Sequence, residues 1–187
     1  MPKQVDHSAQ RRAIAAAAID VIDAAGLEGA RLRDVARAAD VTTGAVTHYF
    51  DDKDAVLDAA LTEIVRRILD KQRAAARDPI EAACAFLPLD EESRREWRVW
   101  LAFWGRAIVD ERLRAQHRAY YAEITAQLAA DIAEKAGLGA ARAARTADAI
   151  VAAIDGVGTR ATLEPDTWPP ARQRATLRAL LSPLFAS

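Results

Sequence analysis

Residues 32–57, LRDVARAADVTTGAVTHYFDDKDAVL, carry the pattern of two short helices joined by a tight turn, with a third helix directly after them. The first apolar residues are spaced by three and four positions, which places them on one face of a short helix. They are Leu32, Val35, Ala36 and Ala39. Asp40 stands where the chain must reverse, and aspartate adopts the left-handed conformation of a tight turn more readily than most residues. The segment therefore predicts a helix-turn-helix motif.

The second helix of this motif is expected to follow Thr42, whose hydroxyl can accept a hydrogen bond from a free amide of the first turn. Val46 and Phe50 lie one turn apart and should face inward. The outward positions are small, polar and almost uncharged: Thr43, Gly44, Ala45, Thr47, His48 and Tyr49. Small side chains would let such a helix approach base edges in a major groove about 12 Å wide. Periodicity alone would suit two packed helices without this role equally well.

Each exposed side chain then has an expected role toward DNA. Thr43, Ala45 and Thr47 are predicted to lie against base edges, where methyl groups and hydroxyls can read thymine methyls and nearby acceptors. Thr42 and Gly44 belong to the same surface. The residues expected to hold phosphates, and so to position the motif without reading sequence, are Arg31, Arg33, Tyr49 and Lys53. His48 stands at the helix end, where it could contact DNA or simply face solvent.

The residues from Gly26 to Leu57 closely resemble the N-terminal DNA-binding domain of the TetR family of transcriptional repressors. The likeness rests on GLEGARLRDVARAADV, TTGAVTHYF and DDKDAVL. Members usually show an apolar-Arg-Asp-apolar-Ala pattern, a Ser or Thr cap, a Gly, and a Tyr or His with Phe ahead of a Lys. The chain departs from the pattern at Asp40, where Gly is usual, and at Ala30 and Arg31, where Thr-Thr is frequent. The second departure changes which groups touch the DNA backbone.

The whole chain is predicted to be all-α, with about nine helices. It has 187 residues, abundant Ala, only 8 Gly and 7 Pro, and no alternating strand pattern. We expect a helix-turn-helix domain over residues 1–52 and a ligand-binding and dimerisation bundle over residues 53–187. The other helices are expected to end at Gly26 and to span 53–77, 80–87, 91–109, 110–136, 140–163 and 171–185. The net charge of −1 does not exclude DNA binding, but it argues against an indiscriminate polycation.

Several functions are disfavoured by composition. Cys84 is the single cysteine, which excludes an intramolecular disulfide, favours a buried side chain over a redox sensor, and suits a reducing cytoplasm. No stretch approaches the roughly 20 apolar residues of a membrane span. The histidines His7, His48 and His117 have no ligand-like spacing, so we predict neither an enzyme nor a metal or cofactor site.

A second informative segment is REWRVWLAFWGRAI, residues 95–108, where aromatic side chains recur on neighbouring turns of one helix. They are Trp97, Trp100, Phe103 and Trp104, and Tyr120 and Tyr121 on the next helix could face them. Such a stripe could be plain core, or it could be a box of aromatic faces that attracts a cation. Asp155 interrupts an apolar helix, where a lone buried carboxylate is costly. Its partner could be an arginine such as Arg106, or it could be a ligand.

The segment LPLDEESRREWRVWLAFWGRAI, residues 87–108, resembles the C-terminal domain of the BetI-type branch of the TetR family, as does DGV from Asp155. The best-known member of that branch responds to choline. The resemblance implies a small effector that could be cationic, such as a quaternary ammonium compound or a polyamine. It does not establish choline.

The last two predicted helices, 140–163 and 171–185, carry apolar faces with small residues. These include Ala149, Ala152, Ala153, Leu177, Leu180, Leu181 and Leu184. In the family the equivalent helices form a four-helix dimer interface, although here they could also only close the monomer. A two-fold dimer would read two half-sites of double-stranded operator DNA. We therefore expect a homodimeric, ligand-responsive repressor. The alternative is a helical protein-interaction module without sequence-specific DNA binding.

Overall fold

The computed structural model describes residues 7–74 and 78–185, which form nine helices and no strand. The helices are α1 His7–Gly29, α2 Leu32–Ala38, α3 Thr43–Tyr49, α4 Lys53–Ala74, α5 Pro79–Cys84, α6 Glu91–Ala107, α7 Glu111–Ala136, α8 Ala140–Leu163 and α9 Pro170–Phe185. This confirms the all-α prediction and its order of elements. The predicted end of the fourth helix, at residue 77, lies outside the described residues.

Helix boundaries differ from the predictions where local hydrogen bonds decide them. Gly26 breaks α1 as expected, with φ of 70°, but helical residues resume and the element ends at Gly29. Helix α5 stops at Cys84 because Phe86 and Leu87 form tighter turns, donating to carbonyls only three residues back. Helix α6 ends at Ala107, two residues earlier than predicted. The Asp110 carboxylate begins α7 there by accepting the amides of its second and third residues.

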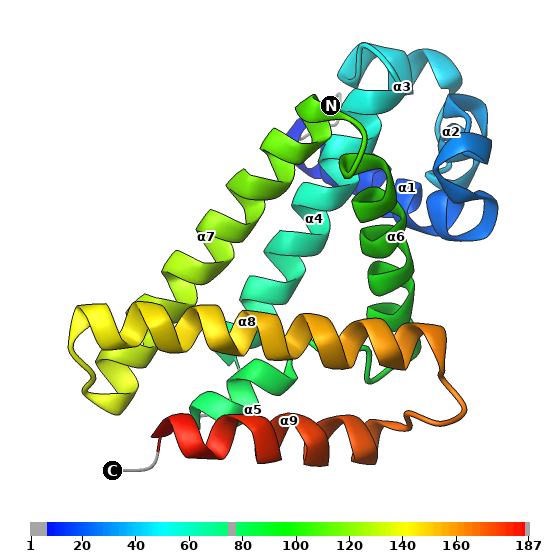
Figure 1. Ribbon diagram of the computed structural model, residues 1–187. Coiled ribbons are helices and arrows are strands. Elements are labelled where there is room, and N and C mark those ends of the chain that lie inside the picture. Colours follow the sequence, from blue (N-terminus) through cyan, green and yellow to red (C-terminus); the bar gives the residue numbers. More distant parts are fainter. Residues whose placement is uncertain (1–6, 75–77, 186–187) are drawn as a thin grey trace.

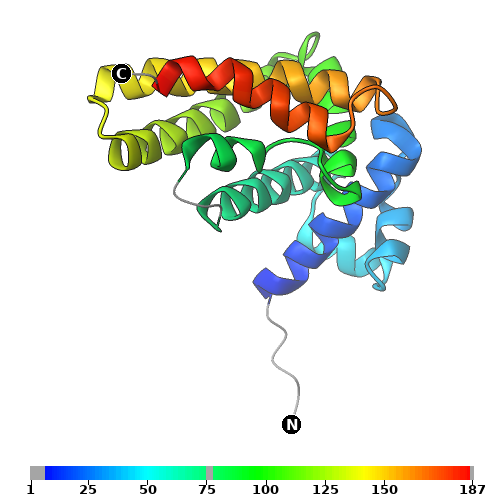
Figure 2. The same ribbon diagram turned by 90° about the horizontal axis from the view of Figure 1, so that it is seen from below.

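The helices fall into a small unit and a larger bundle joined by α4 (Figure 1). Helices α1, α2 and α3 form the small unit, and α4 runs from it into the bundle. Helices α8 and α9 lie against each other, and the view from below shows α9 running along α8 (Figure 2). Helix α1 also packs on α6, so α6 touches both parts of the molecule. Buried apolar side chains form one connected core through both parts.

The expected apolar face of α9 divides between core and surface. Leu177 and Leu181 are 0% and 1% exposed, so they hold α9 to its own chain and are not available to a partner. Leu180, on the flank of this buried face, is 52% exposed. On α8, Ala149 and Ala152 are exposed, whereas Ala153, like Leu184 on α9, is half-buried. The surface left for a partner is therefore smaller than the pattern predicts.

The packing of α6 against α8 depends on the absence of a side chain at Gly158. A Cβ atom there would lie 2.2 Å from the Trp97 ring. The ring cannot easily withdraw, because its Nε1 donates a hydrogen bond of 2.8 Å to the Phe86 carbonyl oxygen. This contact fixes the distance between the two helices at the place where Trp97 enters the bundle.

We predict opposite effects for alanine at two nearby glycines of α8. Gly158→Ala should lower the free energy of unfolding by about 1–3 kcal/mol, because the added methyl overpacks the contact with Trp97. Gly156→Ala is the matched control, since a Cβ there meets nothing within 4 Å; it should raise stability by about 0.5–1 kcal/mol through helix propensity. Urea unfolding followed by circular dichroism measures both. Equal effects of the two substitutions would contradict the tight contact.

Candidate functional site

The turn between α2 and α3 forms as the sequence predicts. Asp40 has φ of 53° and is the only non-glycine residue with positive φ among the described residues. The Thr42 side chain accepts a hydrogen bond of 3.1 Å from the Ala45 amide. Val46 and Phe50 are 0% and 2% exposed, so both face inward as expected. These contacts fix how α3 projects from the small unit.

The opposite side of α3 is small and accessible. Thr43, Gly44, Thr47 and His48 are exposed, and Ala45 and Tyr49 are half-buried. The Thr47 hydroxyl donates to the Gly44 carbonyl oxygen at 3.2 Å. Its hydrogen is therefore used within the helix, and Thr47 offers a methyl group and an acceptor oxygen to the outside.

The residues expected to hold phosphates differ in exposure and in hydrogen bonding. Arg31 and Arg33 are exposed and, among the described residues, form no ion pair with an acidic side chain. Lys53 is half-buried, and its Nζ donates to the Glu28 carbonyl oxygen at 2.9 Å. That hydrogen bond ties the start of α4 to the end of α1, so Lys53 would have to leave it to reach DNA.

His7 also belongs to this surface, although no pattern in the sequence indicates it. Its Nδ1 lies 3.1 Å from the Tyr49 hydroxyl, and its ring lies 6.3 Å from that of His48. Forty-two positions separate His7 from Tyr49, so only the packing of α1 beside α3 could reveal the contact.

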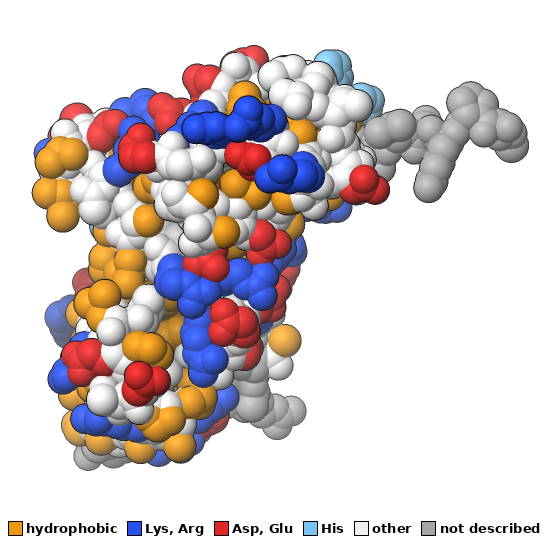
Figure 3. Space-filling view, turned by 90° about the vertical axis from the view of Figure 1, so that its right-hand side faces the viewer, with side chains coloured by type: hydrophobic (Ala, Val, Ile, Leu, Met, Phe, Trp, Pro, Cys, Tyr) orange, Lys and Arg blue, Asp and Glu red, His pale blue; other side chains and the backbone are white. Residues whose placement is uncertain are grey.

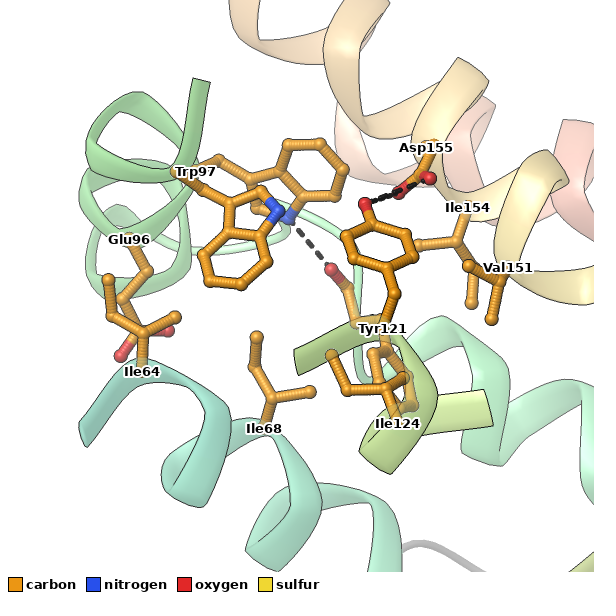
Figure 4. Close-up of a pocket in the computed structure, with 11 residues that line it drawn as sticks. Ile64, Ile68, Glu96, Trp97, Tyr121, Ile124, Val151, Ile154 and Asp155 are labelled. Carbon is orange, nitrogen blue, oxygen red and sulfur yellow. Dashed lines mark hydrogen bonds between the residues drawn. The ribbon is translucent and has the colours of Figure 1, made fainter. Parts of the chain in front are cut away.

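A second candidate site is a cavity inside the bundle, with about 40 Å³ of free space. Its walls come from α4, α6, α7, α8 and the segment after α5 (Figure 4). The lining residues are Ile64, Ile68, Phe86, Glu96, Trp97, Trp100, Tyr121, Ile124, Val151, Ile154 and Asp155. Almost all are apolar or aromatic, so the carboxylates of Asp155 and Glu96 are its two charged groups.

The structure brings together four of the seven residues predicted to contact a ligand. Trp97, Trp100, Tyr121 and Asp155 line the cavity; Phe103, Trp104 and Tyr120 do not. Phe103 and Trp104 lie one to two turns further along α6, beside His117, with ring centroids 6.3 and 6.1 Å from it. The Tyr120 hydroxyl instead donates to Asp58 on α4 at 2.8 Å. The aromatic residues recur along α6 beyond the part of the helix that borders the cavity, so the pattern also included Phe103 and Trp104.

Asp155 is held by a tyrosine rather than by an arginine. The Tyr121 hydroxyl lies 2.9 and 3.0 Å from its two carboxylate oxygens. Arg106, the arginine considered from the sequence, approaches Glu28 instead, at 3.7 Å. Burial raises the pKa of Asp155 to about 6, although the hydrogen bond from Tyr121 opposes the rise. Burial and the Asp155 charge both raise the pKa of the Tyr121 hydroxyl, so it stays protonated and donates.

Glu96 is the other carboxylate of the cavity, and it already has cationic partners. Arg67 and Lys71 on α4 approach it at 3.3 and 3.7 Å. Burial nevertheless raises the pKa of Glu96. In sequence Glu96 follows two arginines and reads as part of a solvated helix face, so its 2% exposure could not be predicted.

Helix α6 also carries the ion pairs that join the bundle to α1. Arg95 meets Asp20 at 2.6 Å, and Arg98 contacts both carboxylate oxygens of Asp23. Basic and acidic side chains accordingly interleave on the face where α1 lies against α6 (Figure 3). One helix therefore has Trp97 and Trp100 at the cavity and Arg95 and Arg98 at the helix-turn-helix unit.

Other kinds of site find no support in the described part of the chain. No three His, Cys, Asp or Glu residues gather there as they would around a metal ion. No helix there is long and apolar enough to cross a membrane. Cys84 is buried, and burial raises the pKa of its thiol.

Two family models match the chain in the order of its two parts. Residues 14–60 match the model for bacterial regulatory proteins of the tetR family. Residues 76–186 match the model for the C-terminal domain of BetI-type transcriptional repressors.

Individual proteins agree with these models. The HTH-type transcriptional regulator BetI of Paraburkholderia phytofirmans is 32% identical, over 90% of this chain and 89% of that protein. The BetI regulator of Burkholderia mallei is 34% identical over 87% of each chain. A solved transcriptional regulator from a Rhodococcus species superposes with a TM-score of 0.79 at 33% identity, covering 93% of this chain and 95% of that one.

A further solved regulator, from Saccharomonospora viridis, was crystallised in complex with choline. It shares the fold, with a TM-score of 0.73 over 93% of this chain and 96% of that one, at 24% identity. The matches extend over the helix-turn-helix unit and the bundle alike. The chain therefore belongs to the TetR family of bacterial transcriptional regulators, with a C-terminal domain of BetI type, and is a ligand-responsive DNA-binding repressor rather than an enzyme.

Proposed function

We propose that the protein is a homodimeric repressor that leaves its operator when a small monovalent cation, such as a quaternary ammonium compound, binds in the cavity. The observation that carries the proposal is Asp155, a largely buried carboxylate in a cavity walled by Trp97, Trp100 and Tyr121, with no cationic partner among the described residues.

The cavity favours a cation by two physical effects. Aromatic faces attract a cation through the ring quadrupole, by about 2 kcal/mol or more when both are removed from water. A bound cation would also restore the charge balance of Asp155, which the Tyr121 hydroxyl only partly stabilises. The choline complex of the Saccharomonospora viridis regulator supports this class of ligand.

The charges favour a monovalent cation over a polyamine. Glu96 is already compensated by Arg67 and Lys71, so it offers little to a second ammonium group. Only Asp155 is left to balance a ligand charge. Polyamines are therefore the second choice among the effectors expected from the sequence.

Binding must change the structure, because about 40 Å³ holds only a few water molecules. A ligand favours whichever state has the larger cavity, and an equilibrium shifts only through such differential affinity. Movement of α6 would be transmitted to α1 through the packing of the two helices, and the exposed pairs of Arg95 and Arg98 with Asp20 and Asp23 would re-form after the shift. In a dimer this would change the spacing of the two recognition helices.

For DNA, we propose that residues 1–52 form the binding domain and residues 53–187 the regulatory domain. The exposed side of α3 would face base edges, with Thr43, Ala45 and Thr47 as readers. Arg31, Arg33, Tyr49 and Lys53 would hold phosphates, with Thr42, Gly44 and His48 on the same surface. Dimerisation through the exposed side of α8 and α9, around Ala149 and Leu180, would supply the second half-site of a palindromic operator.

We predict that Thr47→Ala and Tyr49→Ala each weaken operator binding by about fivefold or more, since each removes a contact worth about 1 kcal/mol. Fluorescence anisotropy with duplex DNA from the promoter next to the gene measures this at fixed salt. Thr167→Ala, on the loop between α8 and α9, is the control and should bind like the unmodified protein. Unchanged affinity in both α3 variants would show that another face contacts DNA.

Choline affinity should fall as the pH drops through about 6, the pKa of Asp155, because protonation removes the charge that holds the cation. Since choline does not titrate, we expect roughly tenfold weaker binding at pH 5 than at pH 7.5. Isothermal titration calorimetry at the two pH values measures it.

Asp155→Asn is the control for this pH dependence, and it should bind weakly at both pH values. Folding raises the pKa of Asp155, so its ionised carboxylate destabilises the folded protein at pH values above the pKa of the unfolded chain. Asp155→Asn removes this charge, and its melting temperature at pH 7.5 should therefore not be lower than that of the unmodified protein. Binding of choline that is strong in Asp155→Asn, or independent of pH in the unmodified protein, would contradict the role of Asp155.

A further inference from the structure

A surface groove between α7 and α8 lies directly outside the cavity. Tyr121, Val151 and Asp155 line both hollows, so these three side chains form the wall between them. The rest of the groove is mostly alanine, including Ala122 and Ala126 of α7. Tyr121, Val151 and Asp155 therefore separate the groove from the cavity.

The wall is closed by the hydrogen bonds of Tyr121 to both oxygens of Asp155, at 2.9 and 3.0 Å (Figure 4). The Tyr121 ring also stacks on His117, with centroids 4.3 Å apart. Asp155 is short and Val151 is stiff and β-branched, whereas a tyrosine can swing as a whole about its first side-chain torsion. Tyr121 is thus the part of the wall that can open without moving a helix.

A second hollow approaches the cavity from the opposite side, but its carboxylates are already paired with basic side chains. This hollow, between α1 and α6, shares Glu96 with the cavity. Arg67 and Arg95 line it together with Asp20 and Glu92. These carboxylates and Glu96 are paired with Arg67, Lys71 and Arg95. The α7–α8 groove instead contains Asp148 and Asp155, and none of the described residues that line it is basic. A cation is therefore attracted more strongly toward the groove, where Asp148 and Asp155 face no basic lining residue, than toward the other hollow, where the charges are paired.

We propose that the α7–α8 groove is the route by which the effector reaches the cavity, and that Tyr121 is the gate residue on this route. The proposal rests on the proposed function for the identity of the effector, but the route itself does not. The ring swings away from Asp155 and uncovers its carboxylate, the cation passes along this carboxylate, and the ring then closes behind the cation against Trp100. The rim of the groove at Ala152 borders the surface proposed for the dimer, so the route opens beside the partner subunit.

Tyr121→Phe tests the gate because it keeps the ring and removes only the hydroxyl that holds Asp155. Stopped-flow measurement of tryptophan fluorescence with choline should show association and dissociation rates that both rise about fivefold or more, while their ratio changes less. A merely structural role would change affinity without raising both rates.

The route is tested separately by blocking the groove. Ala122→Cys, exposed in the groove, can be alkylated with a bulky maleimide while the native Cys84 stays buried. The adduct should slow choline association about tenfold. Ala130→Cys, exposed on α7 outside the groove, is the labelled control and should not slow it.

Quenching of tryptophan fluorescence by acrylamide gives a readout that needs no effector, because Trp97 and Trp100 line the cavity. Tyr121→Phe should raise the quenching constant about twofold, and the adduct at Ala122→Cys should lower it. If choline fails to bind while acrylamide quenching changes as expected in both variants, the route is supported and the proposed class of effector is wrong. If the adducts at positions 122 and 130 behave alike with acrylamide, or if Tyr121→Phe leaves its quenching constant unchanged, the route through this groove is overturned.

Discussion

The structure depends on one constraint: α6 is shared between the cavity and the helix-turn-helix unit. Trp97 and Trp100 face the cavity, while Arg95 and Arg98 pair with aspartates of α1. The Trp97 ring is pressed against Gly158 and hydrogen-bonded to a carbonyl oxygen. Helix α6 therefore cannot shift at one side without disturbing the other, and the same helix can carry a signal between two sites that share no residue.

The two sides of α6 differ in how easily they change. Exposed ion pairs are worth about 0–1 kcal/mol each, so the contacts of Arg95 and Arg98 with α1 can rearrange at little cost. Buried aromatic side chains each remove a large apolar area from water, so the cavity side resists change. A ligand that forces Trp97 or Trp100 to move would thus displace α6 as a unit, and the adjustment would fall on the junction with α1.

Much of the helix-turn-helix could be predicted because its signals are local. The left-handed conformation of Asp40, the cap at Thr42 and the inward pair Val46 and Phe50 all depend on neighbours within a few residues. The cavity could be predicted only in part. The period of the aromatic stripe identified Trp97 and Trp100, but it also included residues beyond the end of the cavity. Three further features depend on contacts between different helices: the hydrogen bond of Tyr121 to Asp155, the burial of Glu96, and the contact of His7 with Tyr49. Periodicity within one helix therefore cannot predict them.

Coupling between the two sites is the central claim, and linkage tests it most directly. Operator affinity is measured by anisotropy with and without saturating choline, and choline affinity is measured by calorimetry with and without operator DNA. If the cavity controls the recognition helices through α6, each ligand weakens the other by the same factor, at least about fivefold. Choline that binds with equal affinity to the free protein and to the operator complex would contradict the account.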